Sequence, residues 1–176
     1  VAVPYSVPHG VTQTPAEALA TVQGYAGSRW WSRDFLDQRS ITQLATFGQG
    51  QLIFPHGGTV DRDGNLWMTD AGSAPGKGHQ AIKFSPDGKI LMTLGKAGVS
   101  GSGPDLFDQP TDVVVAPNGD LFITDSHRNG KNNRVMHFTK DGKFIKERGK
   151  KGMGRGELRE AQTIAMDSRG ALLVGE

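Results

Sequence analysis

The five histidines carry most of the potential for chemistry in this sequence of 176 residues. An imidazole ring can bind a metal ion or transfer a proton near neutral pH. The sequence has no cysteine, which excludes disulfides, thiolate metal sites and cysteine nucleophiles. It also has no phosphate-binding or dinucleotide-binding glycine motif, no serine-hydrolase elbow and no His-Glu-x-x-His motif. The candidate site residues are therefore histidines.

Two histidines stand where a strand is expected to begin or end. His56 follows Pro55, and His127 follows Asp125-Ser126. His56 is interpreted either as a metal ligand or as a polar residue that hydrogen-bonds to a neighbouring repeat. His127 is interpreted either as a catalytic base or substrate contact, or as an exposed loop residue.

The remaining candidates favour structural roles. His79 lies in a Gly-Lys-Gly-His-Gln segment that is typical of a loop contact, and His137 lies on an alternating strand. His9 follows a proline, but nothing around it repeats. Asp70 and Asp125 end equivalent strands, where we expect them to cap loops rather than to line a central channel.

These residues are positioned by an internal repeat. Residues 59–70, 113–125 and 163–176 each contain an aliphatic run, a polar turn ending in glycine and a second apolar run. A further hairpin with the pattern Phe-x-x-Asp-Gly-Lys follows the first two copies, at 81–95 and 134–149. Asp-Gly between alternating runs is a strong hairpin signal, because the turn needs positive φ. The 25 glycines thus indicate many tight turns.

Four short strands repeated every ~40–55 residues are typical of a β-propeller blade. We predict an all-β fold of four-stranded antiparallel blades, because a sandwich would not repeat this closely. Residues 1–39 form an N-terminal segment, with either a short helix or a degenerate blade. Residues 40–176 form the propeller blades.

The blade boundaries follow from the repeat: a last strand at 40–48, full blades at 55–95 and 110–149, and half a blade at 162–176. This is about three blades' worth of strands, whereas closed propellers use about four to eight blades. The propeller is therefore incomplete. We expect a longer chain, self-association of copies or a partner chain to complete the ring, and favour the first.

The sequence resembles NHL-repeat propellers, most closely the bacterial relatives of peptidyl-α-hydroxyglycine α-amidating lyase. The resemblance rests on four segments: FPHGGTVDRDGNLWMTD (54–70), GKGHQAIKFSPDGKILMTLGKAG (76–98), QPTDVVVAPNGDLFITD (109–125) and FTKDGKFIKERGKKGMGRGE (138–157). The resemblance implies a six-bladed propeller with an axial zinc, a nearby calcium and no organic cofactor. The implied reaction splits the C–N bond of a carbinolamide into an amide and glyoxylate, with a metal assisting.

The resemblance also implies site residues. It makes His56 a zinc ligand and the Gly58 carbonyl a calcium ligand, and it places His127 where the family has a catalytic tyrosine. The family's next zinc histidine falls at Gln162, a poor zinc ligand, and its arginine has no counterpart beyond an unsupported Arg29 or Arg33. Catalytic zinc takes about three protein ligands, so enzymatic activity of this chain stays open.

Charge and composition limit the classes of binding partner that we expect for this chain. The net charge is +2, no apolar run reaches the ~18 residues of a membrane span, and the excess of Lys and Arg over 128–160 suits a solvated outer face. We therefore expect no nucleic acid, while the resemblance implies a small molecule or peptide at the propeller axis, with self-association or a partner chain completing the ring as a further expectation. We expect an exported relative of the lyase, with a non-catalytic binding or scaffold propeller as the alternative and a calcium-dependent lactonase as a third hypothesis.

Overall fold

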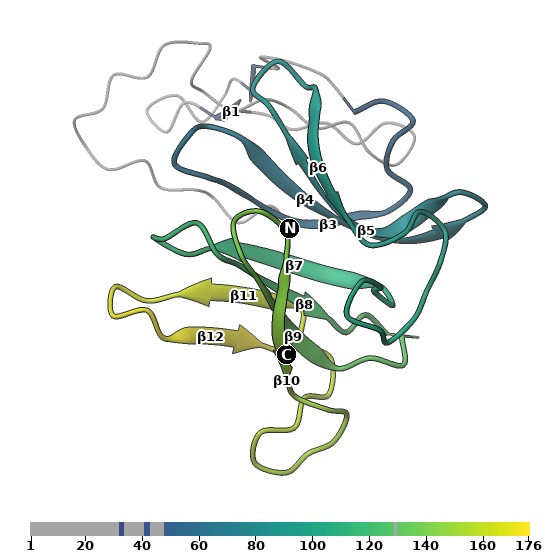
Figure 1. Cartoon of the computed structure of the whole chain (residues 1–176), viewed down its shortest axis with the longest axis vertical. Coiled ribbons are helices and arrows are strands. Elements are labelled where there is room, and N and C mark those ends of the chain that lie inside the picture. The colour runs from purple at the N-terminus through teal and green to yellow at the C-terminus, as the bar shows by residue number, and fades with distance from the viewer. Residues whose placement is uncertain (1–31, 34–40, 43–47, 129) are drawn as a thin grey trace.

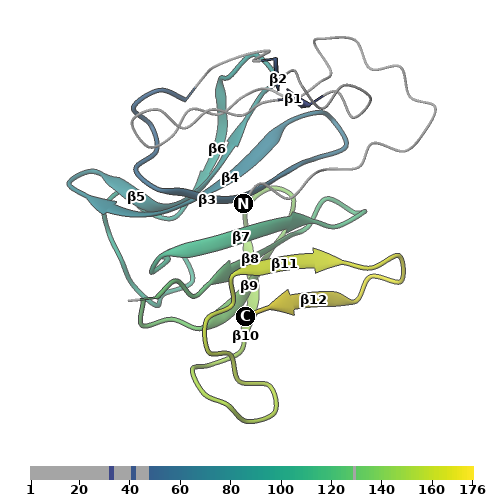
Figure 2. The same cartoon turned by 180° about the vertical axis from the view of Figure 1, so that it is seen from behind.

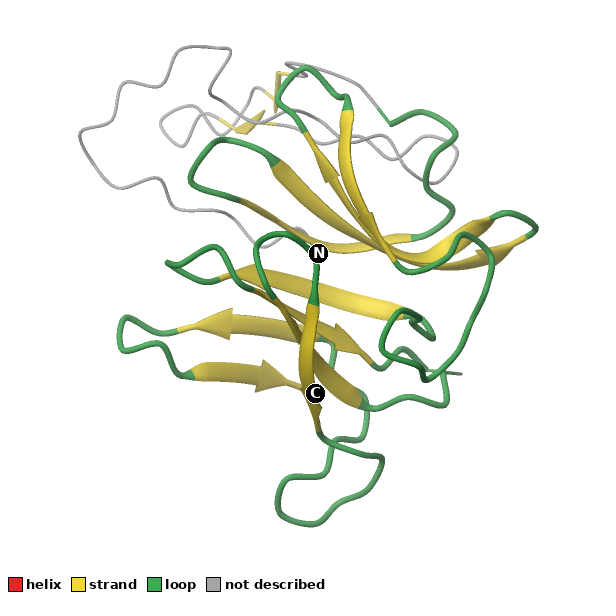
Figure 3. Ribbon diagram, viewed as in Figure 1, coloured by secondary structure: helices red, strands yellow, loops and turns green. Residues whose placement is uncertain are grey.

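The computed structural model describes residues 32–33, 41–42, 48–128 and 130–176. All twelve regular elements in this described part are β-strands (Figure 3). The expected helix in the N-terminal segment lies outside the described residues, as do His9 and Arg29. The strands nearest to that segment are β1 (Ser32–Arg33) and β2 (Ile41–Thr42), which pair with each other.

The first full sheet, here called blade 1, has its four strands in chain order. They are β3 (Pro55–Val60), β4 (Leu66–Ala74), β5 (Lys77–Phe84) and β6 (Ile90–Leu94), and each pairs antiparallel with the next. Glycines close the hairpin turns: Gly64 has a φ of 81° and donates its amide to the Asp61 carbonyl at 3.0 Å. Such a positive φ is costly for residues with a Cβ atom.

The second full sheet, blade 2, repeats this arrangement. Its strands are β7 (Pro110–Val115), β8 (Leu121–Asp125), β9 (Arg134–Phe138) and β10 (Phe144–Arg148), again antiparallel and in chain order. The prediction of four-stranded antiparallel blades is confirmed.

A third unit has two strands, β11 (Thr163–Met166) and β12 (Leu172–Gly175). Figures 1 and 2 show, from opposite sides, that blade 1, blade 2 and the β11–β12 hairpin follow one another in space. The first strands of the three units contact each other, β3 with β7 and β7 with β11. These are the inner strands of the propeller, so residues that begin them lie toward its axis.

The main core lies between the two full blades. Trp67 of β4 is 1% exposed and packs with blade 2 residues, whereas Met68, the next residue, belongs to a separate cluster of blade 1. This follows from the two-residue period of a strand, which sends neighbouring side chains to opposite faces. Burying each large apolar side chain contributes about 1.5–3 kcal/mol. The inter-blade cluster consists of Trp67, Ala81, Leu94, Phe107, Val113, Leu121, Ile123, Met136 and Phe138.

Asp70 and Asp125 cap loops, but only Asp125 ends its strand, because β4 continues past Asp70 to Ala74. The fully buried Asp70 carboxylate accepts the backbone amides of Ile53 at 2.9 Å, Phe54 at 2.8 Å and Gly72 at 3.0 Å. Asp125 accepts the amide of Asp108 at 2.8 Å. Each carboxylate therefore fixes the loop that leads into the inner strand of its own blade, just before Pro55 and Pro110.

Candidate functional site

His56 and His127, which are far apart in the sequence, meet at the boundary between the blades. Their ring centroids are 4.9 Å apart, with an interplanar angle of 75°. Phe54 contacts both rings edge-on, with centroid distances of 5.8 Å to His56 and 5.5 Å to His127. We call these three residues the axial histidine cluster. All three are half-buried, so the cluster is shielded but reachable from solvent.

The strands β3 and β8 determine where the two imidazole rings lie. His56 is the second residue of the inner strand β3, and His127 is the second residue after β8. The amide of His127 donates to the carbonyl of Gln109 at 3.2 Å, and its own carbonyl accepts the amide of Gly130 at 2.7 Å. These bonds hold the backbone of the β8–β9 loop beside the start of the inner strands.

The tautomer of His56 is fixed by one hydrogen bond. Its Nδ1 lies 2.8 Å from the carbonyl oxygen of Thr111, on the inner strand of blade 2. A carbonyl can only accept, so Nδ1 carries the proton and donates it. In the neutral ring, Nε2 then keeps its lone pair for a ligand. The bond to a neighbouring repeat is present, and it leaves Nε2 outside this hydrogen bond.

Threonines that the sequence motifs did not single out build this inter-blade connection. Thr111 occupies in blade 2 the place that His56 occupies in blade 1, after a proline, and its hydroxyl donates to the Ala161 carbonyl at 2.6 Å. Thr69 likewise donates to the Thr111 carbonyl at 3.0 Å. The Thr-Asp pairs that recur in β4 (Thr69-Asp70) and at the end of β8 (Thr124-Asp125) were the available signal.

Asp112 is close to the cluster but is engaged by backbone. Its Oδ1 accepts the amide of Val113 at 2.8 Å, and its Oδ2 accepts the amide of Ile164 at 3.0 Å. Burial raises the pKa of Asp112, while these two amides and the charge of His56 partly counteract that rise. Asp112 therefore joins blade 2 to β11 and is not a free ligand.

The surroundings of His127 favour the neutral form of its ring. Burial lowers the pKa of His127 below its ordinary value, the positive charges of His56 and Arg128 lower it further, and Glu160 raises it. A neutral imidazole can accept a proton or bind a metal ion, whereas a protonated ring can do neither.

Two substitutions are expected to move the pKa of His127 in opposite directions. His56→Gln removes the charge that the His56 ring carries when it is protonated, so the pKa of His127 should rise. Glu160→Gln removes a negative charge, so the pKa should fall further below its ordinary value. An NMR titration of the His127 ring protons in both variants measures this. Shifts of the same sign in both variants would contradict the arrangement.

The other predicted residues lie apart from the cluster. Gly58 is on β3 opposite Met68. The backbone N–H of Gln162 donates to the Gly175 carbonyl at 2.8 Å. His79 is 2% exposed, and its Nδ1 accepts the amide of Gln109 at 3.2 Å. His137 bonds Asp120 at 2.8 Å and stacks on the Phe122 ring at 4.2 Å. Arg33 is in β1, where only the strand itself is described.

The zinc site that the family resemblance implies needs more ligands than these residues offer. Catalytic zinc takes about three protein ligands, but the described residues contain no group of three or more His, Asp or Glu side chains that could hold a metal ion. Gln162 offers no imidazole. The described part of the chain therefore does not provide the family's full ligand set, although His56 fits one of its positions.

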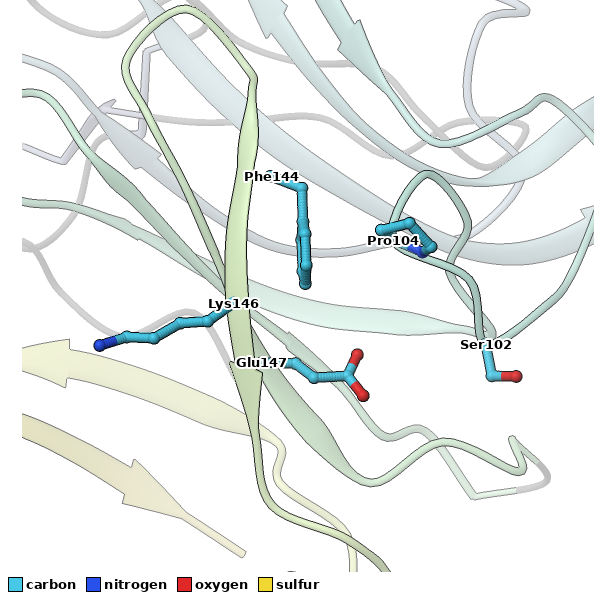
Figure 4. A pocket seen from close by; sticks show the side chains of 5 residues that line it. All are labelled: Ser102, Pro104, Phe144, Lys146 and Glu147. Atoms are coloured by element: carbon cyan, nitrogen blue, oxygen red, sulfur yellow. The ribbon is translucent and has the colours of Figure 1, made fainter.

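A separate hollow lies on the outer side of blade 2, between β10 and the loop before β7 (Figure 4). Figure 4 shows Phe144 beside Pro104 and Glu147 directed toward Ser102, whereas Lys146 points away. All five β10 residues are exposed, as expected for a solvated outer strand. Within the described ranges, no helix is long and apolar enough to cross a membrane.

Comparisons with known proteins agree with this architecture. The NHL repeat family model matches residues 107–138, which contain β7, β8 and β9. Streptogramin B lyase has a similar structure, with a TM-score of 0.51 and 19% identity, over 94% of this chain and 50% of that chain. At that identity the likeness shows the fold alone.

Two sequence relatives carry related names. Peptidyl-glycine alpha-amidating monooxygenase B of Xenopus laevis is 34% identical over 148 residues, which are 80% of this chain and 16% of the relative. A probable peptidyl-alpha-hydroxyglycine alpha-amidating lyase of Caenorhabditis elegans is 39% identical over 100 residues, which are 56% of this chain and 26% of the relative. The chain thus spans about a quarter or less of either relative. This chain is an NHL-repeat protein of β-propeller type, related in sequence to the peptidyl-α-hydroxyglycine α-amidating lyases.

Proposed function

We propose that this chain supplies the axial binding site of an exported, lyase-related propeller, and that the site takes a small molecule or a peptide ending in α-hydroxyglycine. The observation that carries the proposal is the contact between His56 and His127, 4.9 Å apart at the start of the inner strands. The ligand class comes from the name of the C. elegans relative. Residues that converge on the axis from different blades are typical of a ligand site.

Each residue of the cluster has a part in this proposal. The Nδ1–H bond of His56 to Thr111 turns its Nε2 toward a ligand or metal, and His127 adds a second neutral imidazole. Phe54 supplies an apolar wall against both rings. A bound zinc would act as a Lewis acid toward a substrate hydroxyl, and the Gly58 carbonyl is the proposed calcium ligand. The described residues supply no group of three side chains that could hold the zinc by themselves.

A second candidate function is a non-catalytic binding propeller for a protein or small molecule. Gln162 favours it, since this residue stands at the family's second zinc position without an imidazole. The two candidates share the axial site and differ only in whether a bound carbinolamide is cleaved.

A titration of the full chain with a peptide ending in α-hydroxyglycine tests the site. We expect binding to shift the NMR signals of His56 and His127, and the His127→Ala variant to bind about tenfold more weakly, a loss of about 1.4 kcal/mol. His137→Gln, remote from the cluster on β9, is the matched control and should bind normally.

Absence of binding, or equal binding by His127→Ala, would refute the proposed site. Glyoxylate release in the same mixture decides between the candidates. Release that depends on His56 supports the lyase, and binding without release supports the non-catalytic propeller.

A further inference from the structure

We infer that His79 of blade 1 is a positioning residue of the axial site, because it sets the place of the loop that carries His127 through the backbone of Gln109. The inference rests on the proposed axial site and adds to it a residue that lies apart from the axial histidine cluster. It gives His79 a role beyond the loop contact that its sequence pattern indicates.

Two hydrogen bonds in series join His79 to His127. The Nδ1 atom of His79 accepts the backbone amide of Gln109 at 3.2 Å, and the carbonyl of Gln109 accepts the amide of His127 at 3.2 Å. His79 is 2% exposed and lies on β5 of blade 1, whereas His127 follows β8 of blade 2. An Nδ1 atom that accepts carries no proton, so the neutral ring is protonated at Nε2. A buried side chain of blade 1 thus holds the His127 loop of blade 2 through a single residue.

The bond to His79 departs from the pattern of the repeat. Phe54 and Gln109 occupy equivalent places, each directly before the proline that opens an inner strand. In blade 1, the amide of Phe54 donates to Asp70 of the same blade at 2.8 Å. In blade 2, the amide of Gln109 donates instead to His79 of the neighbouring blade. Of the two full blades, the one whose loop carries His127 therefore has the cross-blade bond.

Backbone strain is concentrated at the same two residues. Within the described ranges, His79 and Gln109 are the two non-glycine residues with positive φ, at 57° and 69°. This region is costly for residues with a Cβ atom, and a residue before proline is pushed toward extended backbone. Gln109 also has a buried Oε1 atom without a hydrogen-bond partner in the described part of the chain, which is a further cost. Strain of this kind is typical of functional sites, where the surrounding structure holds it in place.

The local backbone directs His79 toward blade 2. The register of the β4–β5 pair shifts between Asp70 and Ser73, and the two β4 residues between them face His79 alone. This is a β-bulge, a feature that re-aims side chains beside active sites. A Cβ atom at Gly95 would lie 2.4 Å from the carbonyl oxygen of His79, so the backbone of His79 has little room to shift. The imidazole acceptor is therefore held at the blade boundary.

Amide hydrogen exchange of the full chain, followed by NMR without a ligand, tests the positioning. His79→Gly and His79→Leu both remove the acceptor but have opposite side effects, because glycine relieves the positive φ and leaves a cavity, whereas leucine fills the space and strains the backbone. We expect the His127 amide to exchange about tenfold faster or more in both variants, as a local opening. The Asp112 amide, which donates to Thr124 Oγ1 within blade 2 at 3.0 Å, is the internal control and should keep its rate.

His79→Asn is the conservative variant. Asparagine tolerates positive φ, and its side-chain oxygen can accept the Gln109 amide as Nδ1 does. This variant should therefore keep the slow exchange of His127. In the titration with the α-hydroxyglycine peptide, it should bind like wild type, whereas His79→Gly and His79→Leu should bind about tenfold more weakly.

The exchange rates and the titration separate the inference from the proposed function. An unchanged His127 rate, or equal acceleration of the His127 and Asp112 amides, would overturn the positioning role, since the second result is a general loss of stability. Faster exchange at His127 with unchanged peptide affinity would overturn it as well. If the wild-type chain binds no peptide, the proposed function fails, while the exchange rates still decide whether His79 positions His127. Circular dichroism shows that each variant is folded.

Discussion

Replacing Arg134 with leucine is expected to lower the free energy of unfolding by about 3–5 kcal/mol, the usual cost of breaking a buried ion pair from one side. Arg134 is 4% exposed, and its guanidinium bonds the buried Asp125 carboxylate at 3.2 Å and also Glu147. It also donates to three backbone carbonyls of the loop before β7: Ser102, Gly103 and Leu106. Urea denaturation followed by circular dichroism measures the loss.

The loss should grow with pH. Burial raises the pKa of Asp125 to about 6, and Asn132 and Arg134 partly counteract that rise. Without Arg134 the folded-state pKa of Asp125 rises further, so the folded variant keeps its proton where the unfolded chain has lost it. A carboxyl with a raised folded-state pKa loses stability as pH increases. The difference from wild type should therefore be larger at about pH 8 than at about pH 5.

Arg148→Leu is the matched control, because Arg148 lies on the neighbouring strand β10 and is exposed. Exposed substitutions of this kind usually change stability by within ~0.5 kcal/mol. If both arginine variants lost the same stability, the buried network around Arg134 would not be the cause.

Arg134 also shows where sequence patterns stop being informative. It belongs to the basic segment 128–160, which we assigned to a solvated outer face. That assignment holds for exposed Lys146 and Arg148 of β10 but is wrong for Arg134, which is buried. A charge count cannot separate the two, because burial depends on which loop folds over the strand. Here the loop that covers it, residues 102–106, comes from an earlier part of the chain.

The blades, by contrast, could be predicted because their signals are local. Asp-Gly turns and two-residue alternation act within one hairpin, and Gly88 and Gly142 indeed have φ values of 82° and 78°. The meeting of His56 and His127 needed more than local signals. The repeat places one at a strand start and the other after a strand end, but only the packing of β3 against β7 brings them to 4.9 Å.

Trp67 tests that packing directly, and Trp67→Ala is expected to destabilise the fold by about 3–5 kcal/mol. Its side chain is 1% exposed and lies in the cluster shared by the two blades, and the Lys83 ammonium is 5.8 Å from its ring centroid. The alanine no longer buries a large ring. It also leaves a cavity between the two blades, which the surrounding side chains can fill only in part. Urea denaturation of the full chain measures the effect, with Leu91→Ala, a 52% exposed position on β6, as the control.

Trp67→Ala should also change the cooperativity of unfolding and the binding of a ligand, because neighbouring repeats stabilise one another mainly through their shared interface. The cavity in Trp67→Ala weakens the contact that also sets the distance between His56 on β3 and the Thr111 carbonyl on β7. Unfolding should therefore become less cooperative, with a lower denaturant slope than in wild type, and the affinity for the α-hydroxyglycine peptide should fall although no residue of the axial histidine cluster has changed. If Trp67→Ala unfolded with an unchanged slope and bound the peptide normally, the axial histidine cluster would have to be held by loops of its own and not by the packing of blade 1 on blade 2.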